Sequence, residues 1–261
     1  MDSLARASFH QSPVQLSQKS FDNGRVVLIT ARLVTLVEDV HVKVPTGMAA
    51  LTMRGNSELN LQGFSFSVEG GIALSCEEEG RGTRASRSSQ VVVMNGEISA
   101  SGDAVAAISA SWIGNITMKN LSIRGDAETY IRIQDCGRTV LLNVAIVGAF
   151  ADNPSRIALS CSCSRASRSP PCGISLLALS ILDTNAAPER EGALISFCRL
   201  RCVRICKFHC LFPGCSVFQI VDCPNVTMDM SDCDIESGDK EESEIENLIL
   251  FPQRFQMSSE T

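Results

Sequence analysis

The sequence predicts an all-β fold, a single parallel β-solenoid of about eight turns with a cap at each end. Two observations support this. Apolar residues occupy alternate positions in many short segments, and a period of two indicates strands. These segments also return at intervals of roughly 20–25 residues, which indicates stacked repeat units. Only 5% of the residues are aromatic, so the core must come from Val, Ile, Leu, Ala and Cys, which suits stacked strands.

Each predicted unit combines a shorter alternating segment with a longer one. Within the predicted units the hairpin dipeptide Asn-Gly occurs only at Asn95-Gly96, so a meander of tight antiparallel hairpins is disfavoured. The longer segments are 57–70, 114–126, 137–148, 173–183, 203–212 and 225–235, the shorter ones are 50–55, 104–111, 130–135, 193–198 and 217–222, and 26–44 and 72–101 join the series.

The solenoid is predicted to span residues 25–238. Residues 1–24 form an N-terminal cap or arm, and residues 239–261 form an acidic connector and a C-terminal cap. Caps are expected because the end of a solenoid otherwise exposes core residues and unpaired strand edges.

The units ITMKNLSIRG (116–125) and VLLNVAIVG (140–148), with VVVMNG (91–96), resemble the rung of the right-handed parallel β-helix superfamily, often called pectin-lyase-like. Asn120 and Asn143 fall in one column of this alignment, which predicts an inward-facing asparagine ladder at a turn. The resemblance implies an architecture. It implies no activity, because the fold carries lyases, hydrolases and viral structural proteins.

The sequence IALSC, followed by a polar stretch and RASRS, occurs twice, at 72–88 and 157–169. The two IALSC strands are predicted to lie three turns apart, so the loops leave the same edge about 14 Å apart. Their arginines form a candidate site for a phosphate, an acidic polymer or an acidic partner protein. The alternative is a duplicated, solvated loop. The candidate residues are Arg81, Arg84, Arg87, Arg165 and Arg168.

The chain contains 12 cysteines. Because small buried residues stack on their own kind in solenoids, an inward thiol ladder is expected. Zinc is the alternative at Cys161, Cys163 and Cys172, where a loop could fold back, and stacked thiols also come within reach of disulfides. No cofactor is predicted. The predicted columns are Cys136, Cys172, Cys202 and Cys223 in one, and Cys210 and Cys233 in another.

Arg132, Asp135 and Arg138 are the candidates for a catalytic group, with a surface charge cluster as the alternative. Asp135 and Asp222 end equivalent strands, but three turns separate them by about 14 Å. A glycosidase pair needs about 5–9.5 Å. The sequence contains no glycine-rich phosphate loop, no HExxH motif and none of the motifs of the polygalacturonase-like β-helix enzymes.

One further charge pattern has a structural interpretation. Basic residues of one turn are expected to stack on acidic residues of the next and so neutralise a sheet face. The basic set is Arg199, Arg201, Arg204 and Lys207, and the acidic set is Asp229, Asp232 and Asp234.

The net charge of −6 and the pI of about 5.2 make nucleic acid an unlikely partner. No apolar run reaches the ~18 residues of a membrane span. The sequence has no signal peptide, so an intracellular location with reduced thiols is expected, or a virion if the protein is viral. We therefore expect a non-catalytic structural or interaction protein with protein partners, including copies of itself. The alternatives are a carbohydrate-active lyase or hydrolase acting on an exposed sheet face, and a binder of an acidic polymer through the arginine loops.

Overall fold

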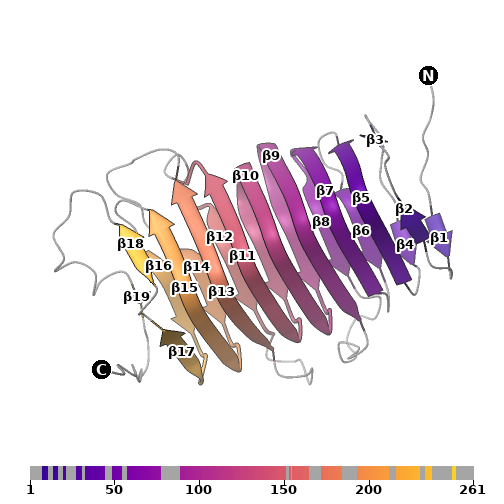
Figure 1. Cartoon of the computed structure of the whole chain (residues 1–261). Coiled ribbons are helices and arrows are strands. Elements are labelled where there is room, and N and C mark those ends of the chain that lie inside the picture. The colour runs from indigo at the N-terminus through magenta and orange to yellow at the C-terminus, as the bar shows by residue number, and fades with distance from the viewer. Residues whose placement is uncertain are drawn as a thin grey trace.

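The computed structural model is built of parallel strands that wind as a coil (Figure 1). Every strand pairing among the described residues is parallel, and none of these residues lies in a helix. The predicted all-β solenoid is confirmed. The structure describes residues 8–10, 14–16, 20–21, 28–30, 33–44, 49–54, 58–77, 89–150, 153, 155–164, 172–183, 193–211, 216–229, 233–236 and 249–250.

Each turn contains a long strand that bends once and a short strand that returns along the other side. In the two middle turns the long and short strands run together as one continuous element. The long strands are β5 (Leu33–Val44), β7 (Glu58–Glu69), β9 (Gln90–Ser111), β10 (Asn115–Gln134), β11 (Arg138–Gly148), β13 (Gly173–Asp183) and β15 (Cys202–Leu211). The short strands are β4 (Leu28–Thr30), β6 (Ala49–Arg54), β8 (Ile72–Glu77), β12 (Ile157–Ser162), β14 (Ala193–Cys198) and β16 (Ser216–Val221).

Shorter strands extend the coil at both ends. Within residues 1–24, three strands pair with β4 and β5, so parallel pairing begins upstream of residue 25. Within residues 239–261, one strand pairs with β16. The remainder of both segments lies outside the described residues. These end strands are β1 (Ser8–His10), β2 (Val14–Leu16), β3 (Ser20–Phe21), β17 (Val226–Asp229), β18 (Asp234–Glu236) and β19 (Ile249–Leu250).

The strand register confirms the spacing predicted for the two IALSC strands. Ile72 pairs with Ala106, Ala106 with Thr129, and Thr129 with Ile157. Strands β8 and β12 therefore occupy the same position of the coil, three turns apart. The alternation of buried and exposed residues is the same in both, with Leu74 and Leu159 facing inward.

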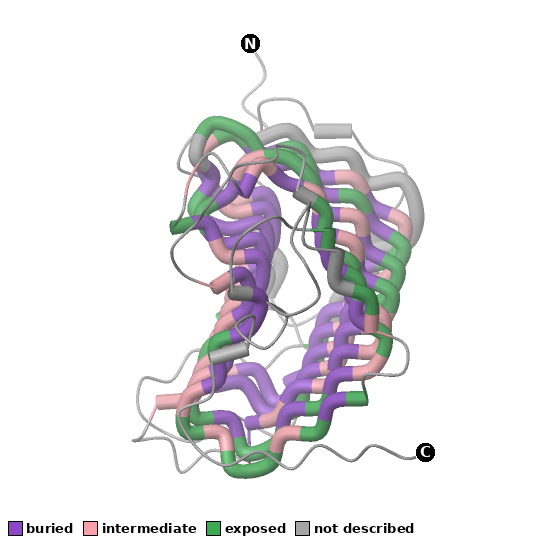
Figure 2. The backbone as a smooth tube through the Cα atoms, turned by 90° about the vertical axis from the view of Figure 1, so that its left-hand side faces the viewer, coloured by how far each residue is buried: buried purple, intermediate pink, exposed green. Residues whose placement is uncertain are grey.

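The core consists of columns of apolar side chains, one from each turn. Figure 2 views the coil end-on and marks the buried residues along its walls. Like stacks on like because equivalent positions of successive turns lie directly over one another. One column contains Phe66, Ile98, Ile123, Ile146, Ile181 and Cys210, and another contains Leu51, Leu74, Ile108, Ile131, Leu159, Ile195 and Phe218.

The long strands bend at a column of residues in the left-handed conformation, which also includes Gly63, Ala178 and Lys207. We call its three asparagines the asparagine corner: Asn95, Asn120 and Asn143, with φ of 52°, 52° and 53°. Asparagine tolerates this conformation better than most residues. The Asn120 amide donates to Asn95 Oδ1 at 2.9 Å, and the Asn143 amide donates to Asn120 Oδ1 at 3.0 Å. The predicted ladder is confirmed, but its inward orientation is wrong because all three side chains are exposed.

Candidate functional site: a buried carboxylate among thiols

A second corner of the coil lies where the short strands end. Trp112, Asp135, Arg199 and Asp222 adopt left-handed φ values of 64°, 52°, 58° and 54°. Each follows the last residue of a short strand in its turn. Backbone hydrogen bonds continue the parallel ladder through this corner: Asp135 N donates to Ser162 O at 2.9 Å, and Arg199 N donates to Val221 O at 2.8 Å. Asp135 and Asp222 are thus equivalent residues three turns apart, as predicted.

Asp135 is a buried carboxylate with 0% of its surface exposed. Its Oδ1 accepts a hydrogen bond from Ser164 N at 2.5 Å. Its Oδ2 is also buried, and no residue of the described part of the chain donates a hydrogen bond to it. Buried polar atoms nearly always have partners, because desolvation without compensation is costly. Asn60 Oδ1 and Thr139 Oγ1 are also buried without a hydrogen-bond partner among the described residues, but Asp135 is the one carboxylate of the three.

Four cysteines lie close to Asp135, and with it they form what we call the thiol corner: Asp135, Cys136, Cys161, Cys163 and Cys172. The sulfur atoms of Cys163 and Cys172 are 2.7 Å apart. Cys136 Sγ donates to Gln134 O at 3.3 Å and to Ala110 O at 3.5 Å. Cys136, Cys161 and Cys172 are buried, whereas Cys163 is half-buried.

Burial makes most of these thiols weak acids. Desolvation raises the pKa of Cys136 to about 12, although backbone hydrogen bonds pull in the opposite direction. Desolvation also raises the pKa of Cys161 well above its ordinary value, and neighbouring thiols add to the effect. The pKa of Cys172 is raised first by burial and then by its hydrogen bond with Cys163. These groups are therefore protonated at neutral pH, when thiolate would be the reactive form.

The three catalytic candidates do not converge. Arg132 lies on the outer side of the short strands, between Ser109 and Ser160, and its Nη2 donates to Thr129 Oγ1 at 3.4 Å. Arg138 is exposed at the start of β11. Among the described contacts, none joins either arginine to Asp135.

The zinc candidates converge only in part. Cys163 and Cys172 are adjacent, but Cys161 belongs to the inward column that also contains Cys76, Ile133 and Phe197. Within the described ranges, no group of three His, Cys, Asp or Glu residues is arranged to hold a metal ion.

The predicted cysteine columns are right for one pair and wrong for the others. Cys136 and Cys223 directly follow the equivalent residues Asp135 and Asp222 and so share a position of the coil. Cys202 is exposed and pairs with Gly173, and Arg201 N donates to Cys172 O at 2.8 Å, so Cys172 and Cys202 belong to neighbouring columns. Cys223 lies opposite Leu200, whose N–H donates to its Sγ at 3.3 Å. Cys210 pairs with Ile235, not with Cys233.

The arginines of the two loops, Arg81, Arg84, Arg87, Arg165 and Arg168, lie outside the described residues. Only the strands that precede the loops are placed, three turns apart at one position of the coil. Their role as an anion site stays a prediction.

Two ion pairs join neighbouring turns in this region, but each includes a residue outside the predicted basic and acidic sets. Arg199 Nε lies 3.8 Å from Asp222 Oδ2, and His209 Nδ1 lies 3.4 Å from Asp234 Oδ2. In the strand register Asp229 lies opposite Cys206. Asp232 lies outside the described part of the chain.

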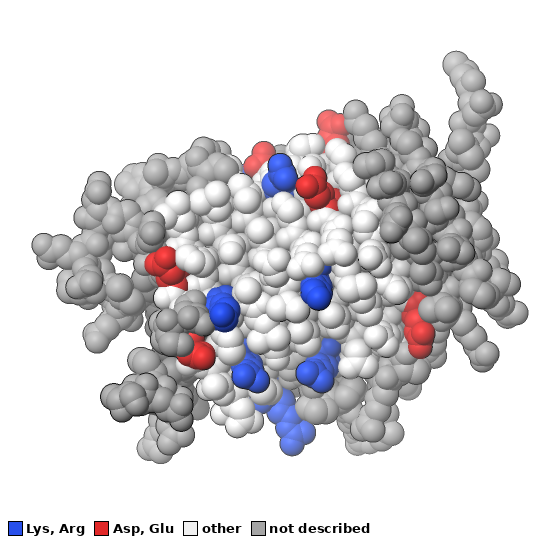
Figure 3. Space-filling view, in the orientation of Figure 1, with Lys and Arg blue, Asp and Glu red and all other residues white. Residues whose placement is uncertain are grey.

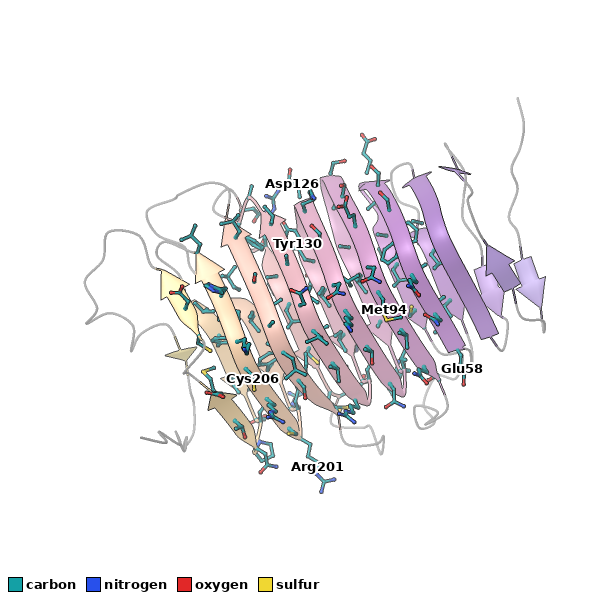
Figure 4. All side chains as sticks on the ribbon, viewed as in Figure 1. Glu58, Met94, Asp126, Tyr130, Arg201 and Cys206 are labelled. Atoms are coloured by element: carbon teal, nitrogen blue, oxygen red, sulfur yellow. The ribbon has the colours of Figure 1, made fainter. Side chains whose placement is uncertain are left out.

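Sequence reasoning missed a second polar cluster, at the opposite end of the long strands from Arg201 (Figure 4). The buried Arg156 donates through Nη1 to Asp126 Oδ1 at 3.1 Å and to Ala149 O at 2.6 Å. Tyr130, the only tyrosine of the chain, follows Asp126 closely in the sequence. It is fully buried, and its hydroxyl group donates a hydrogen bond to Gly125 O. The lone tyrosine within an alternating strand was the available signal.

No protein-family model, curated protein or solved structure matches the chain. Among the described residues, no helix has the length and apolar character needed to cross a membrane.

Proposed function

We propose that this chain is a non-catalytic structural protein that uses an outer face of its solenoid to assemble with protein partners, first of all with copies of itself. The supporting observation is an exposed aliphatic stripe on the long strands. Leu182 and Leu211 are 40% and 43% exposed, and they are direct register partners on β13 and β15. Val147 precedes Leu182 in the same column and is half-buried.

The surface around this stripe is weakly charged. Figure 3 shows the long-strand side with few charged side chains among many uncharged ones. Ala145 and Ser180 flank the stripe one column away. In the same column as the stripe, Arg124 lies 3.7 Å from Glu97, so part of the nearby charge is already compensated.

Adjacent exposed leucines on a flat sheet favour burial against another protein surface, because apolar area removed from water contributes roughly 25 cal/mol per Å². Isolated exposed leucines are ordinary, whereas a contiguous stripe is typical of an interaction surface. The parallel coil keeps the stripe flat, since its members repeat at the strand spacing of ~4.8 Å. We infer further that the coil is right-handed, as in the pectin-lyase-like superfamily that its rungs resemble, and that it serves within a larger assembly, either inside the cell or in a virion.

Self-association is tested by light scattering coupled to size exclusion over a series of protein concentrations. We expect the mass of the wild-type protein to rise above 28.1 kDa as concentration increases. The double variant Leu182→Lys/Leu211→Lys should stay at the monomer mass, because lysine ammonium groups are strongly hydrated.

The matched control is Gln90→Lys/Asn115→Lys, which places the same two charges on exposed register partners at the other end of the long strands. This variant should associate like the wild-type protein. A wild-type protein that remains monomeric at every concentration contradicts the proposal, and so does a double variant that associates normally.

A further inference from the structure

The closest pair of reactive groups in the described structure is the pair of thiols Cys163 and Cys172. Their sulfur atoms lie 2.7 Å apart. A disulfide bond measures about 2.05 Å, so a movement of well under 1 Å would bring the two atoms to bonding distance.

Both cysteines are held by the coil on either side of the second inserted loop. Cys163 N donates to Cys198 O at 3.0 Å, and the next residue, Ser164, donates its N–H to the buried Asp135 carboxylate. Cys172 O accepts a hydrogen bond from Arg201 N at 2.8 Å. Each thiol is thus fixed to a neighbouring turn, and the pair meets without any rearrangement of strands.

We propose that Cys163 and Cys172 are a redox-active pair that forms a disulfide with a low-molecular-weight disulfide such as oxidised glutathione as the oxidant. The bond would close residues 163–172, which contain the second RASRS sequence, into a covalent ring. The inference does not depend on the proposed self-association.

The order of the two steps follows from exposure. Cys163 is half-buried, whereas Cys172 is only 4% exposed, so the small oxidant reaches Cys163 first. The Cys163 thiolate attacks one sulfur of oxidised glutathione, which forms a mixed disulfide and releases one glutathione thiolate. Cys172 then loses its proton to water and attacks the Cys163 sulfur, which forms the protein disulfide and releases the second glutathione thiolate. Two protein thiols are oxidised and one glutathione disulfide is reduced to two glutathione molecules.

The neighbouring thiols are poorer candidates for the bond. Cys161 faces the core in a column of apolar residues, and Cys136 donates its S–H to backbone carbonyl oxygens. Cys163 and Cys172, by contrast, are in direct sulfur–sulfur contact.

The experiment uses the full-length protein, reduced, freed of reductant and incubated with mixtures of reduced and oxidised glutathione. After an acid quench and alkylation of remaining thiols, trypsin cuts at Arg156, Arg165, Arg168 and Arg190. Peptides 157–165 and 169–190 are then separate chains, and only a disulfide joins them. We expect mass spectrometry to detect the joined pair, with two hydrogen atoms lost, and its disappearance on reduction.

Peptide 157–165 contains both Cys161 and Cys163, so fragmentation at Ser162 must assign the bond. Cys161→Ala should retain the joined peptides. Cys163→Ser and Cys172→Ser should abolish them, and Cys172→Ser should accumulate glutathione on Cys163. Cys172→Ala provides a second variant in case the serine substitution at this buried position prevents folding. The matched control is Cys202→Ser, which removes an exposed thiol from the next turn and should leave the joined pair unchanged.

Three outcomes would overturn the proposal. The first is an absence of joined peptides under conditions that glutathionylate the exposed Cys202. The second is a bond assigned to Cys161 and Cys172. The third is a Cys172→Ser protein that still yields joined peptides.

Discussion

The two corners of the coil both turn the chain through residues in the left-handed conformation, but their side chains differ. At the asparagine corner, three turns place the same residue in the left-handed conformation, and the exposed amides hydrogen-bond to one another. At the corner where the short strands end, Trp112, Asp135, Arg199 and Asp222 adopt that conformation with three different kinds of side chain. One of them is buried with an oxygen that none of the described residues satisfies.

The difference separates a structural corner from a chemical one. A uniform, satisfied ladder repeats because each amide supplies both a donor and an acceptor to its neighbours. The thiol corner interrupts this regularity with a carboxylate and closely spaced thiols, and such local departures from consistent packing are typical of functional sites. Three experiments sharpen the contrast.

The largest effect should be the loss of stability at alkaline pH, to which the thiol corner contributes and the asparagine corner does not. Burial raises the pKa of Cys76, Cys136 and Cys161 above the ordinary value of 9.0. Above pH 9 the unfolded chain loses these thiol protons while the folded chain keeps them, so the free energy of unfolding falls as pH rises. Each thiol should contribute roughly 1 kcal/mol per pH unit.

Urea unfolding between about pH 7.5 and pH 10.5, roughly 1.5 units either side of the ordinary thiol pKa of 9.0, measures this slope. Cys136→Val should make the dependence of the unfolding free energy on pH less steep, by about the contribution of one thiol. Asn143→Ala, at the asparagine corner, should lower the stability without altering the slope. Equal slopes for the wild-type protein and Cys136→Val would show that Cys136 titrates alike in the folded and unfolded chains.

The second effect concerns the buried carboxylate. Asp135→Ala removes the acceptor for Ser164 N and leaves alanine in a left-handed conformation. We expect a loss of about 2–3 kcal/mol in the free energy of unfolding. Asp135→Asn keeps an acceptor and tolerates the conformation, so it should remain within about 1 kcal/mol of the wild-type protein. Equal losses in the two variants, measured by denaturant unfolding at pH 7, would contradict this account.

The smallest effect should come from the asparagine corner. Asn120→Ala breaks two exposed amide hydrogen bonds and adds the conformational cost of a left-handed alanine. The expected loss is about 1 kcal/mol, because exposed hydrogen bonds contribute little net stability. Asn120→Gly removes only the hydrogen bonds and should cost less than half as much. A loss at Asn120→Ala larger than that at Asp135→Ala would reverse the comparison.

The fold was predictable because parallel stacking leaves two patterns in the sequence. Apolar residues alternate with polar ones within a strand, and similar segments recur from turn to turn. The register of β8 and β12 follows directly from this. The orientation of the asparagine ladder could not be predicted in this way, because the left-handed residue interrupts the alternation of buried and exposed positions. Counting in twos from Met118 places Asn120 inside, whereas Leu121 is the next buried residue.

The site was predictable only in its ingredients. Asp135, Cys163 and Cys172 stood out as residue types, but their meeting depends on how neighbouring turns place Ser164 beside Asp135 and Cys172 beside Cys163, which the alternating pattern does not encode. Loops of unequal length also shifted the cysteine columns by one or two residues, which placed Cys172 beside Cys202 in error. The burial of Asp135 gave no signal, since a polar residue at the end of a strand is ordinarily exposed.

The described strands pair only with the turn before and the turn after, and this has a mechanical consequence. The free energy of unfolding of such an array is close to a sum of contributions from each turn and from its contacts with neighbouring turns, so no single contact holds the whole molecule together. If the two chain ends were pulled apart in an optical trap, the polypeptide should peel away in successive small steps from its ends. The last segment to yield should be the continuous β9–β10 hub, whose strands run unbroken through both sides of the coil.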